Sequence, residues 1–143
     1  MNQLLGYKKS INEISRIAKT TMLISAEDKK IISGLKLPEN YIAIAIGGEW
    51  PYRTYNNWNK VIRRIFANDK TLNIVFIGSE NGEDTASKLI EEFSNFNVQN
   101  YVAKFTFNQT AEIIKQAKIL LCCDGGLMHS ANAVGTTVIP LLA

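Results

Sequence analysis

Five short apolar segments, separated by segments with helical spacing, constrain the fold of this chain more than any other feature. They cover residues 41–46, 72–77, 98–102, 119–123 and 137–142. Strands that alternate with single helices predict βαβ crossovers and therefore a parallel sheet. Because the segments are continuously apolar, both faces of that sheet should be buried. We expect an α/β, Rossmann-like three-layer unit with a parallel sheet of about five strands.

Residues 1–40 form a second, more polar zone with a helical pattern. Ile11, Ile14, Ile17 and Ala18 make one amphipathic stripe, and a short helix is predicted over residues 27–33, ending near Gly34. Residues 37–40 are typical of a linker. We therefore expect a helical N-terminal segment with a linker at 1–40 and the Rossmann-like domain at 41–143.

Charge and cysteine content exclude several classes of function. The net charge is +3, and the basic residues are scattered, so no nucleic-acid partner is expected. No apolar run approaches the roughly 20 residues of a membrane span. Cys122 and Cys123 are adjacent on a predicted strand and point to opposite faces, which disfavours a disulfide between them and fits a reducing, cytoplasmic compartment. Neither a metal site nor a cofactor is indicated.

Three loops follow the carboxyl ends of the predicted strands, where ligands bind to sheets of this kind. The loop at 124–129 carries Asp124, Gly125 and Gly126 directly before a helix. Helix N-terminal amides and the helix dipole favour phosphates, and the glycines allow close approach of a ligand. Asp124 is expected to cap the helix or to orient its amides. An ordinary turn with an Asp cap is an equally open interpretation.

The other two loops supply further candidates. Arg53, in the loop at 47–55, would bind a diphosphate through charge-assisted hydrogen bonds. An aromatic residue of the same loop would stack on a base, the candidates being Trp50, Tyr52 and Tyr55. In the loop at 78–84, Glu80 or Glu83 would accept hydrogen bonds from ribose hydroxyls. The alternatives are a solvated arginine, packing aromatics and carboxylates favoured by the helix dipole.

Read in order, these motifs resemble the C-terminal half of the heptosyltransferase family of GT-B glycosyltransferases. The family has a strand, then Asp-Ser/Thr-Gly-x-x-His, then an Ala-rich helix ending in Gly, and residues 124–135 are similar to it. Residues 105–117 resemble the preceding segment of the family. Gly47-Gly48 with Arg53 and Trp58, and then Gly78-Ser79-Glu80, resemble its first two loops. The resemblance covers residues 41–143, and the joint order of four motifs gives it specificity.

The resemblance implies a donor site for a nucleotide-diphosphate sugar, ADP-heptose, transferred to the lipopolysaccharide core with inversion and without a metal. It implies diphosphate contacts from Arg53 and from the last loop, namely Asp124, Gly125, Gly126, Leu127 and His129. It also implies ribose or base contacts from Glu80, Glu83, Gly47 and Gly48. The family's general base and acceptor site belong to an N-terminal domain, so no catalytic residue is expected in these 143 residues. Peripheral membrane association of a full-length enzyme is compatible with this function.

Two alternatives follow from departures from the family pattern. Gly125 replaces the usual Ser or Thr, and Thr137 replaces a proline before the last strand. A non-enzymatic α/β module with vestigial ligand loops would tolerate both changes. A GT-B enzyme half that uses a UDP-sugar is the second alternative.

Overall fold

A five-stranded parallel sheet forms the centre of the molecule. The computed structural model describes residues 20–48, 50 and 54–141. The strands are β1 (Tyr41–Ala45), β2 (Asn73–Ile77), β3 (Val98–Asn100), β4 (Ile119–Cys123) and β5 (Thr137–Leu141). Their order is β3-β2-β1-β4-β5, and every neighbouring pair is parallel. The predicted Rossmann-like sheet is therefore confirmed, and its order reverses direction between β1 and β4.

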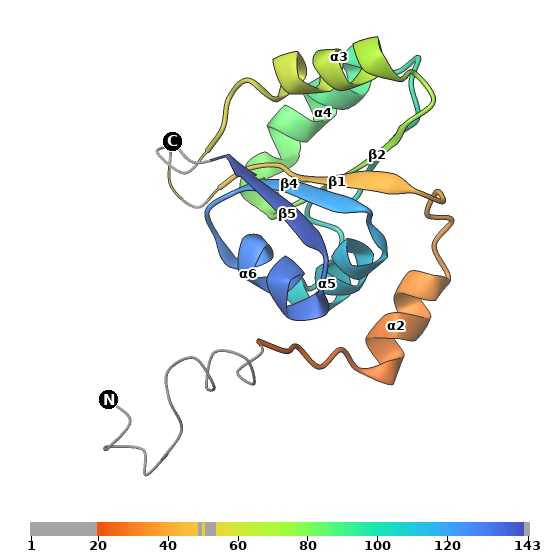
Figure 1. The fold of residues 1–143 in the computed structure, drawn as a ribbon, viewed down its shortest axis with the longest axis vertical. Helices are drawn as coiled ribbons and strands as arrows, with labels where there is room; N and C mark the ends of the chain where they lie inside the picture. The colour runs from red at the N-terminus through yellow and green to blue at the C-terminus, as the bar shows by residue number, and fades with distance from the viewer. Residues whose placement is uncertain (1–19, 49, 51–53, 142–143) are drawn as a thin grey trace.

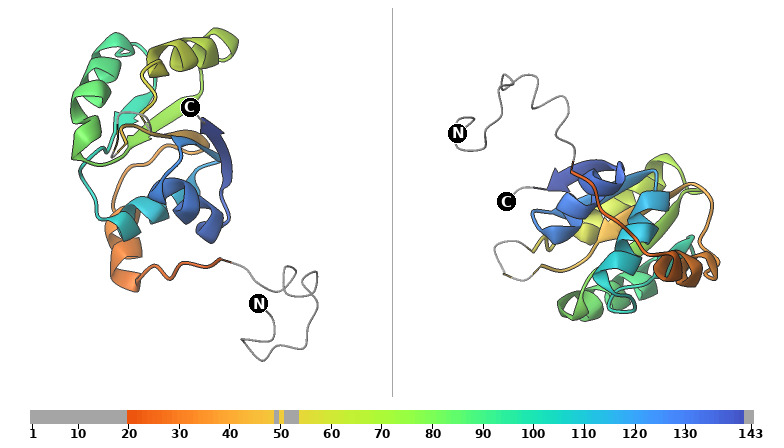
Figure 2. Two further views of the ribbon diagram at one scale, coloured as in Figure 1. Left: turned by 90° about the vertical axis from the view of Figure 1, so that its left-hand side faces the viewer. Right: turned by 90° about the horizontal axis from the view of Figure 1, so that it is seen from below.

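Helices cover both faces of this sheet (Figures 1 and 2). They are α2 (Ala26–Ser33), α3 (Trp58–Asn68), α4 (Glu83–Glu92), α5 (Phe107–Gln116) and α6 (Gly126–Val134), with a 3-10 turn, η2 (Glu80–Gly82), before α4. The helices α3 and α4 pack on one face, while α2, α5 and α6 lie on the other. In the described residues, no helix is long and apolar enough to cross a membrane.

The face under α3 and α4 is closed by a row of large side chains. Trp58, Ile62 and Phe66 recur every fourth residue along α3 and are almost fully buried. They pack against strand residues such as Ile44 and Phe76. Because these positions lie on one helical stripe, the amphipathic spacing alone directs α3 onto the sheet.

The opposite face is closed by aliphatic residues of α5 and by Ala131 of α6. Ile32 of α2 is 1% exposed and belongs to the same core. The Gln109 amide on α5 also donates a 3.0 Å hydrogen bond to Asp28 on α2. The helix predicted near residues 27–33 thus packs onto the α/β body, while the division at residue 40 stays a prediction.

Local capping explains where several elements begin and end. Thr106 and Gln109 form the predicted capping box of α5, and α6 ends at Gly135, which has a φ of 84°. The third strand is shorter than predicted because the Asn100 side chain accepts from the Val102 amide and Ala103 turns the chain with a φ of 57°.

Candidate functional site

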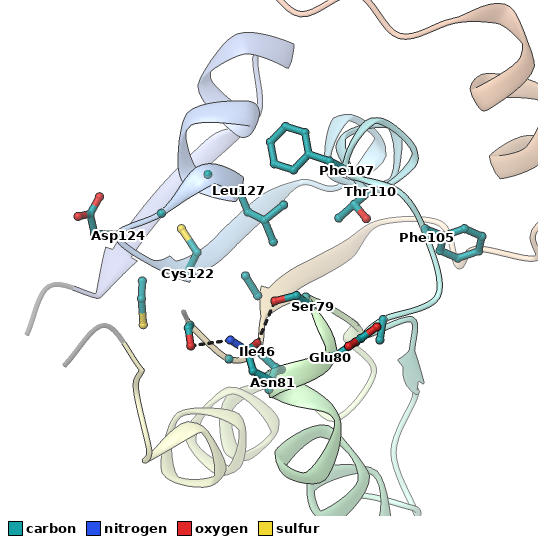
Figure 3. Close-up of a pocket in the computed structure, with 18 residues that line it drawn as sticks. Ile46, Ser79, Glu80, Asn81, Phe105, Phe107, Thr110, Cys122, Asp124 and Leu127 are labelled. Carbon is teal, nitrogen blue, oxygen red and sulfur yellow. Dashed lines mark hydrogen bonds between the residues drawn. The ribbon is translucent and has the colours of Figure 1, made fainter. Parts of the chain in front are cut away.

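A cavity of about 690 Å³ lies at the carboxyl ends of β1, β2 and β4, beside the point where the strand order reverses (Figure 3). This volume falls in the range that holds small ligands. The three predicted loops and the segment around the start of α5 line it. The lining residues are Ala45–Gly48, Gly78–Asn81, Ala103, Phe105, Phe107, Thr110 and Cys122–Leu127.

Close backbone contacts form the part of the cavity wall where β1 and β2 end. The carbonyl oxygen of Ile46 lies 2.5 Å from the place that a β-carbon on Gly82 would occupy. The same oxygen lies still closer to the equivalent position on Gly78, which has a φ of 149°. A β-carbon at either position would collide with backbone. Glycine is therefore required here so that the first and second loops can touch.

The Asn81 carboxamide joins these two loops. Its Nδ2 donates to the Gly48 carbonyl oxygen at 2.7 Å, and its Oδ1 accepts from the Ser79 hydroxyl at 2.9 Å (Figure 3). Gly47, with a φ of 90°, has no room for a β-carbon, because Asn81 Oδ1 would lie 2.8 Å away from it. The Gly47–Gly48 backbone is thus held in place from the β2 side of the cavity.

The N-terminus of α6 forms the opposite wall. The N-cap residue is Gly125 rather than Asp124, which corrects the expected cap. The amides of Met128 and His129 both donate to the Gly125 carbonyl. The N–H groups of Gly126 and Leu127 therefore precede the intrahelical hydrogen bonding and are suited to bind an anion.

The two glycines of this loop have different surroundings. Gly125 has an extended φ of 167°, and no atom lies within 4 Å of the position that its β-carbon would take. A β-carbon on Gly126 would lie 3.3 Å from the Phe107 ring. The backbone conformation at position 125 therefore does not require glycine, and the space beside its α-carbon is open.

The lining carries negative side chains within the described part of the chain. Glu80 and Asp124 both line the cavity, and the lining residues include no lysine, arginine or histidine. Arg53, the predicted diphosphate ligand, lies outside the described residues. The attraction for an anion that the described residues offer therefore comes from backbone amides and the α6 dipole.

Some predicted residues do not reach the cavity. Glu83 lies in the first turn of α4, and His129 lies one turn into α6; both are exposed and neither lines the cavity. Among the aromatic candidates, Tyr55 packs edge-on against Trp58 with ring centroids 5.1 Å apart. Trp50 is half exposed and is not part of the lining, and Tyr52 lies outside the described residues.

Other lining residues were missed by sequence reasoning. Phe107 is 51% exposed at the first position of α5, and Thr110 is 6% exposed one turn later. Phe105 packs against Tyr101 with ring centroids 5.7 Å apart. The capping box at Thr106 was the signal that could have found these residues, because it fixes a helix start beside the loops.

The two cysteines are buried or half-buried thiols in the described structure. Burial, then the neighbouring Cys123 and Asp124, raises the pKa of Cys122 to about 11. Burial also raises the pKa of Cys123, against a hydrogen bond from the Tyr55 backbone. Both thiols are therefore protonated at neutral pH, which disfavours a nucleophilic or redox role.

Comparison with known proteins gives the fold and the family. A structure of a glycosyl transferase family 9 protein from Veillonella parvula superposes with a TM-score of 0.71 at 17% identity, covering 84% of this chain and 36% of that one. ADP-heptose lps heptosyltransferase II from E. coli superposes with a TM-score of 0.69 at 18% identity, covering 85% of this chain and 39% of that one. E. coli heptosyltransferase WaaC with ADP-2-deoxy-2-fluoro heptose superposes with a TM-score of 0.65 at 21% identity, covering 97% of this chain and 41% of that one.

The chain thus spans between 36% and 41% of the length of these three proteins. No curated protein sequence matches it significantly. The family model for glycosyltransferase family 9 (heptosyltransferase) matches residues 2–143. That match extends over almost the whole chain, so the chain belongs to glycosyltransferase family 9, the heptosyltransferase family.

Proposed function

We propose that this chain is the donor-binding half of a glycosyltransferase that takes ADP-heptose and transfers heptose to the lipopolysaccharide core. The observation that carries the proposal is the cavity at the carboxyl ends of β1, β2 and β4, with the α6 N-terminus in its wall. Family membership supports the sugar-transfer chemistry. The neighbours that contain ADP or its heptose derivative support the choice of donor.

The diphosphate is assigned to the α6 end of the cavity. The Gly126 and Leu127 amides would donate to phosphate oxygens, and the α6 dipole adds about 0.3–1 kcal/mol, or up to about 2 kcal/mol when partly buried. The open space over Gly125 leaves room for a phosphate to approach the backbone. Arg53 remains our candidate for the cation that balances Glu80 and Asp124.

The nucleoside is assigned to the neighbouring part of the cavity, between the start of α5 and the loop after β2, with the Phe107 ring close to Gly126. Glu80 is preferred over Glu83 as the ribose ligand, because only Glu80 belongs to the lining. Phe107 offers an exposed aromatic face, and Thr110 offers a hydroxyl beside it (Figure 3). An aromatic face and a few fixed polar groups suit a nucleobase.

The chemical task of this half is to stabilise the leaving group. Sugar transfer breaks the bond between the anomeric carbon and the diphosphate, and negative charge develops on the departing oxygen. Backbone amides aimed at that oxygen stabilise the charge without reorganisation. We propose an inverting, metal-independent reaction in which the general base and the acceptor come from outside these 143 residues, in the bacterial cytoplasm.

An amide NMR titration of this chain with ADP, and separately with UDP, tests the proposal. We expect concentration-dependent shifts at Gly125, Gly126, Leu127 and Thr110, with ADP binding more tightly than UDP. Unchanged spectra at millimolar ADP would contradict a donor site in this chain. Tighter binding of UDP would instead redirect the proposal to a UDP-sugar.

A further inference from the structure

We propose that Asn81 is a positioning residue of the donor site, which fixes the Gly47–Gly48 backbone at the cavity wall by a hydrogen bond to the Gly48 carbonyl. This inference rests on the proposed function, because it assigns Asn81 an effect on nucleotide binding. Asn81, Gly47 and Gly48 all line the cavity. The bond joins residues 33 positions apart, on the loops after β1 and β2.

Both polar atoms of the Asn81 side chain are engaged. The donor Nδ2 lies 2.7 Å from the Gly48 oxygen, and the acceptor Oδ1 lies 2.9 Å from the Ser79 hydroxyl. Because a carbonyl only accepts, the group that faces Gly48 must be a donor. The Gly48 carbonyl thus determines which way the carboxamide faces, and the Ser79 hydroxyl donates to the oxygen that remains. Asparagine is therefore suited to this position in a way that aspartate at neutral pH is not.

The Gly48 carbonyl also receives a contact from the other end of its loop. The Thr54 hydroxyl lies 3.4 Å from the Gly48 oxygen and 3.0 Å from the Trp50 oxygen. The Gly48 carbonyl oxygen thus links residue 54 to residue 48, and the same oxygen accepts from Asn81 in the loop after β2. Loss of the Asn81 donor would leave the Gly48 carbonyl without its bond to the loop after β2. The part of the cavity wall that Gly47 and Gly48 form would then be free to move.

The position of Asn81 argues against a purely structural role. Its side chain is exposed, in a 3-10 turn of three residues, and is not part of either hydrophobic core. Exposed hydrogen bonds contribute little to global stability. We therefore expect its removal to change nucleotide affinity more than the unfolding midpoint.

The test measures ADP affinity by isothermal titration calorimetry on the 143-residue chain. Asn81→Ala should weaken binding by roughly threefold to tenfold at pH 7.5, the effect of one positioned hydrogen bond. Asn68→Ala is the matched control, since Asn68 is another exposed asparagine that donates to a backbone carbonyl, that of Arg64, at 2.7 Å. It should leave the affinity unchanged.

Asn81→Asp gives a sharper readout because it keeps the shape of the side chain. The ionised carboxylate cannot donate to Gly48, whereas the protonated form can. At pH 7.5 a carboxylate with an ordinary pKa of about 3.9 is ionised, so Asn81→Asp should bind ADP at least as weakly as Asn81→Ala.

The outcomes separate the two proposals. Failure of the wild type to bind millimolar ADP defeats the proposed function. If the wild type binds ADP and the affinity of Asn81→Ala lies within twofold of it, the inference about Asn81 is overturned and the proposed function stands. Should Asn81→Ala unfold, Ser79→Ala provides the second variant. It keeps the Asn81 donor but removes the hydrogen bond that holds the carboxamide oxygen, and an affinity equal to that of the wild type would count against the inference. Binding of ADP by Asn81→Asp as tight as that of the wild type at pH 7.5 would also overturn it.

Discussion

The Tyr41 hydroxyl on β1 donates a buried hydrogen bond to the carbonyl oxygen of Ile113, 72 residues further along the chain. Ile113 lies in the last turn of α5, where helix carbonyls lack intrahelical partners. The Thr136 hydroxyl donates to the next carbonyl, that of Ile114, at 2.9 Å. Side chains from the sheet and from the segment before β5 thus cap α5, which holds its other end at the cavity.

Tyr41→Phe should therefore destabilise the chain at neutral pH. The substitution keeps the ring but leaves the buried Ile113 carbonyl without its donor, which costs about 1–3 kcal/mol. Urea unfolding at pH 7 measures the difference from the wild type. An equal free energy of unfolding for the two proteins would show that the bond contributes nothing.

The difference in unfolding free energy between the wild type and Tyr41→Phe should also depend on pH. Burial, followed by the charge of Glu112 and then Tyr101, raises the pKa of Tyr41 above its usual value near 10. The folded state therefore keeps this proton when the unfolded state has lost it, so the contribution is complete below pH 10 and is lost as the pH rises further. The stability advantage over Tyr41→Phe should narrow above pH 10 by up to about 1.4 kcal/mol per pH unit. A constant difference between pH 8 and 11 would contradict this.

Much of the fold followed from local sequence, because local forces determine it. The apolar segments, the capping box at Thr106 and the helical spacing of Trp58 and Ile62 each act over a few residues, and the structure confirms the strands, the cap and the helix. The expectation that both faces of every strand are buried is wrong for the edge strand β5, where Ile139 is 46% exposed. The burial of Ile32 was not predicted, because it depends on α5 lying against α2. The early end of β3 depends on the side chain of Asn100, which the strand pattern does not show.

The site was predictable at the level of loops but not of side chains. The rule that ligands bind beyond the strand ends selected three loops, and all three line one cavity. Which carboxylate enters the cavity depends on η2, which separates Glu80 from Glu83. The bond between Asn81 and Gly48 required knowledge that β1 and β2 are neighbours.

Gly82→Ala should destabilise the fold more than Gly125→Ala. The new β-carbon at position 82 would lie 2.5 Å from the backbone oxygen of Ile46, whereas nothing lies within 4 Å of the one at position 125. The close contact forces the backbone apart, at about 1–3 kcal/mol. Thermal or urea unfolding of both variants measures this. Similar losses for the two glycines would mean that the contact between the loops relaxes freely.

Phe107→Ala should weaken ADP binding with little effect on stability. The ring is 51% exposed, so its removal uncovers little core. Loss of base stacking costs about 1–3 kcal/mol when the platform is removed. Inorganic pyrophosphate, which has no base, is the control ligand, and its affinity should not change. Equal losses for ADP and pyrophosphate would place the effect on the α6 end of the cavity instead.

Gly126→Pro and Gly126→Ala form a matched pair for the diphosphate site. Gly126 is the first residue of α6, a position where proline is favoured because its N–H is not needed by the helix. Both variants add a β-carbon near the Phe107 ring, but only proline removes the amide donor. If this amide binds a phosphate oxygen, Gly126→Pro should bind ADP about tenfold more weakly than Gly126→Ala, corresponding to about 1.4 kcal/mol. Calorimetry at equal ionic strength gives the comparison, and unfolding midpoints show whether both variants keep the fold. Equal ADP affinities in two folded variants would remove the Gly126 amide from the phosphate contacts and shift the assignment to Leu127.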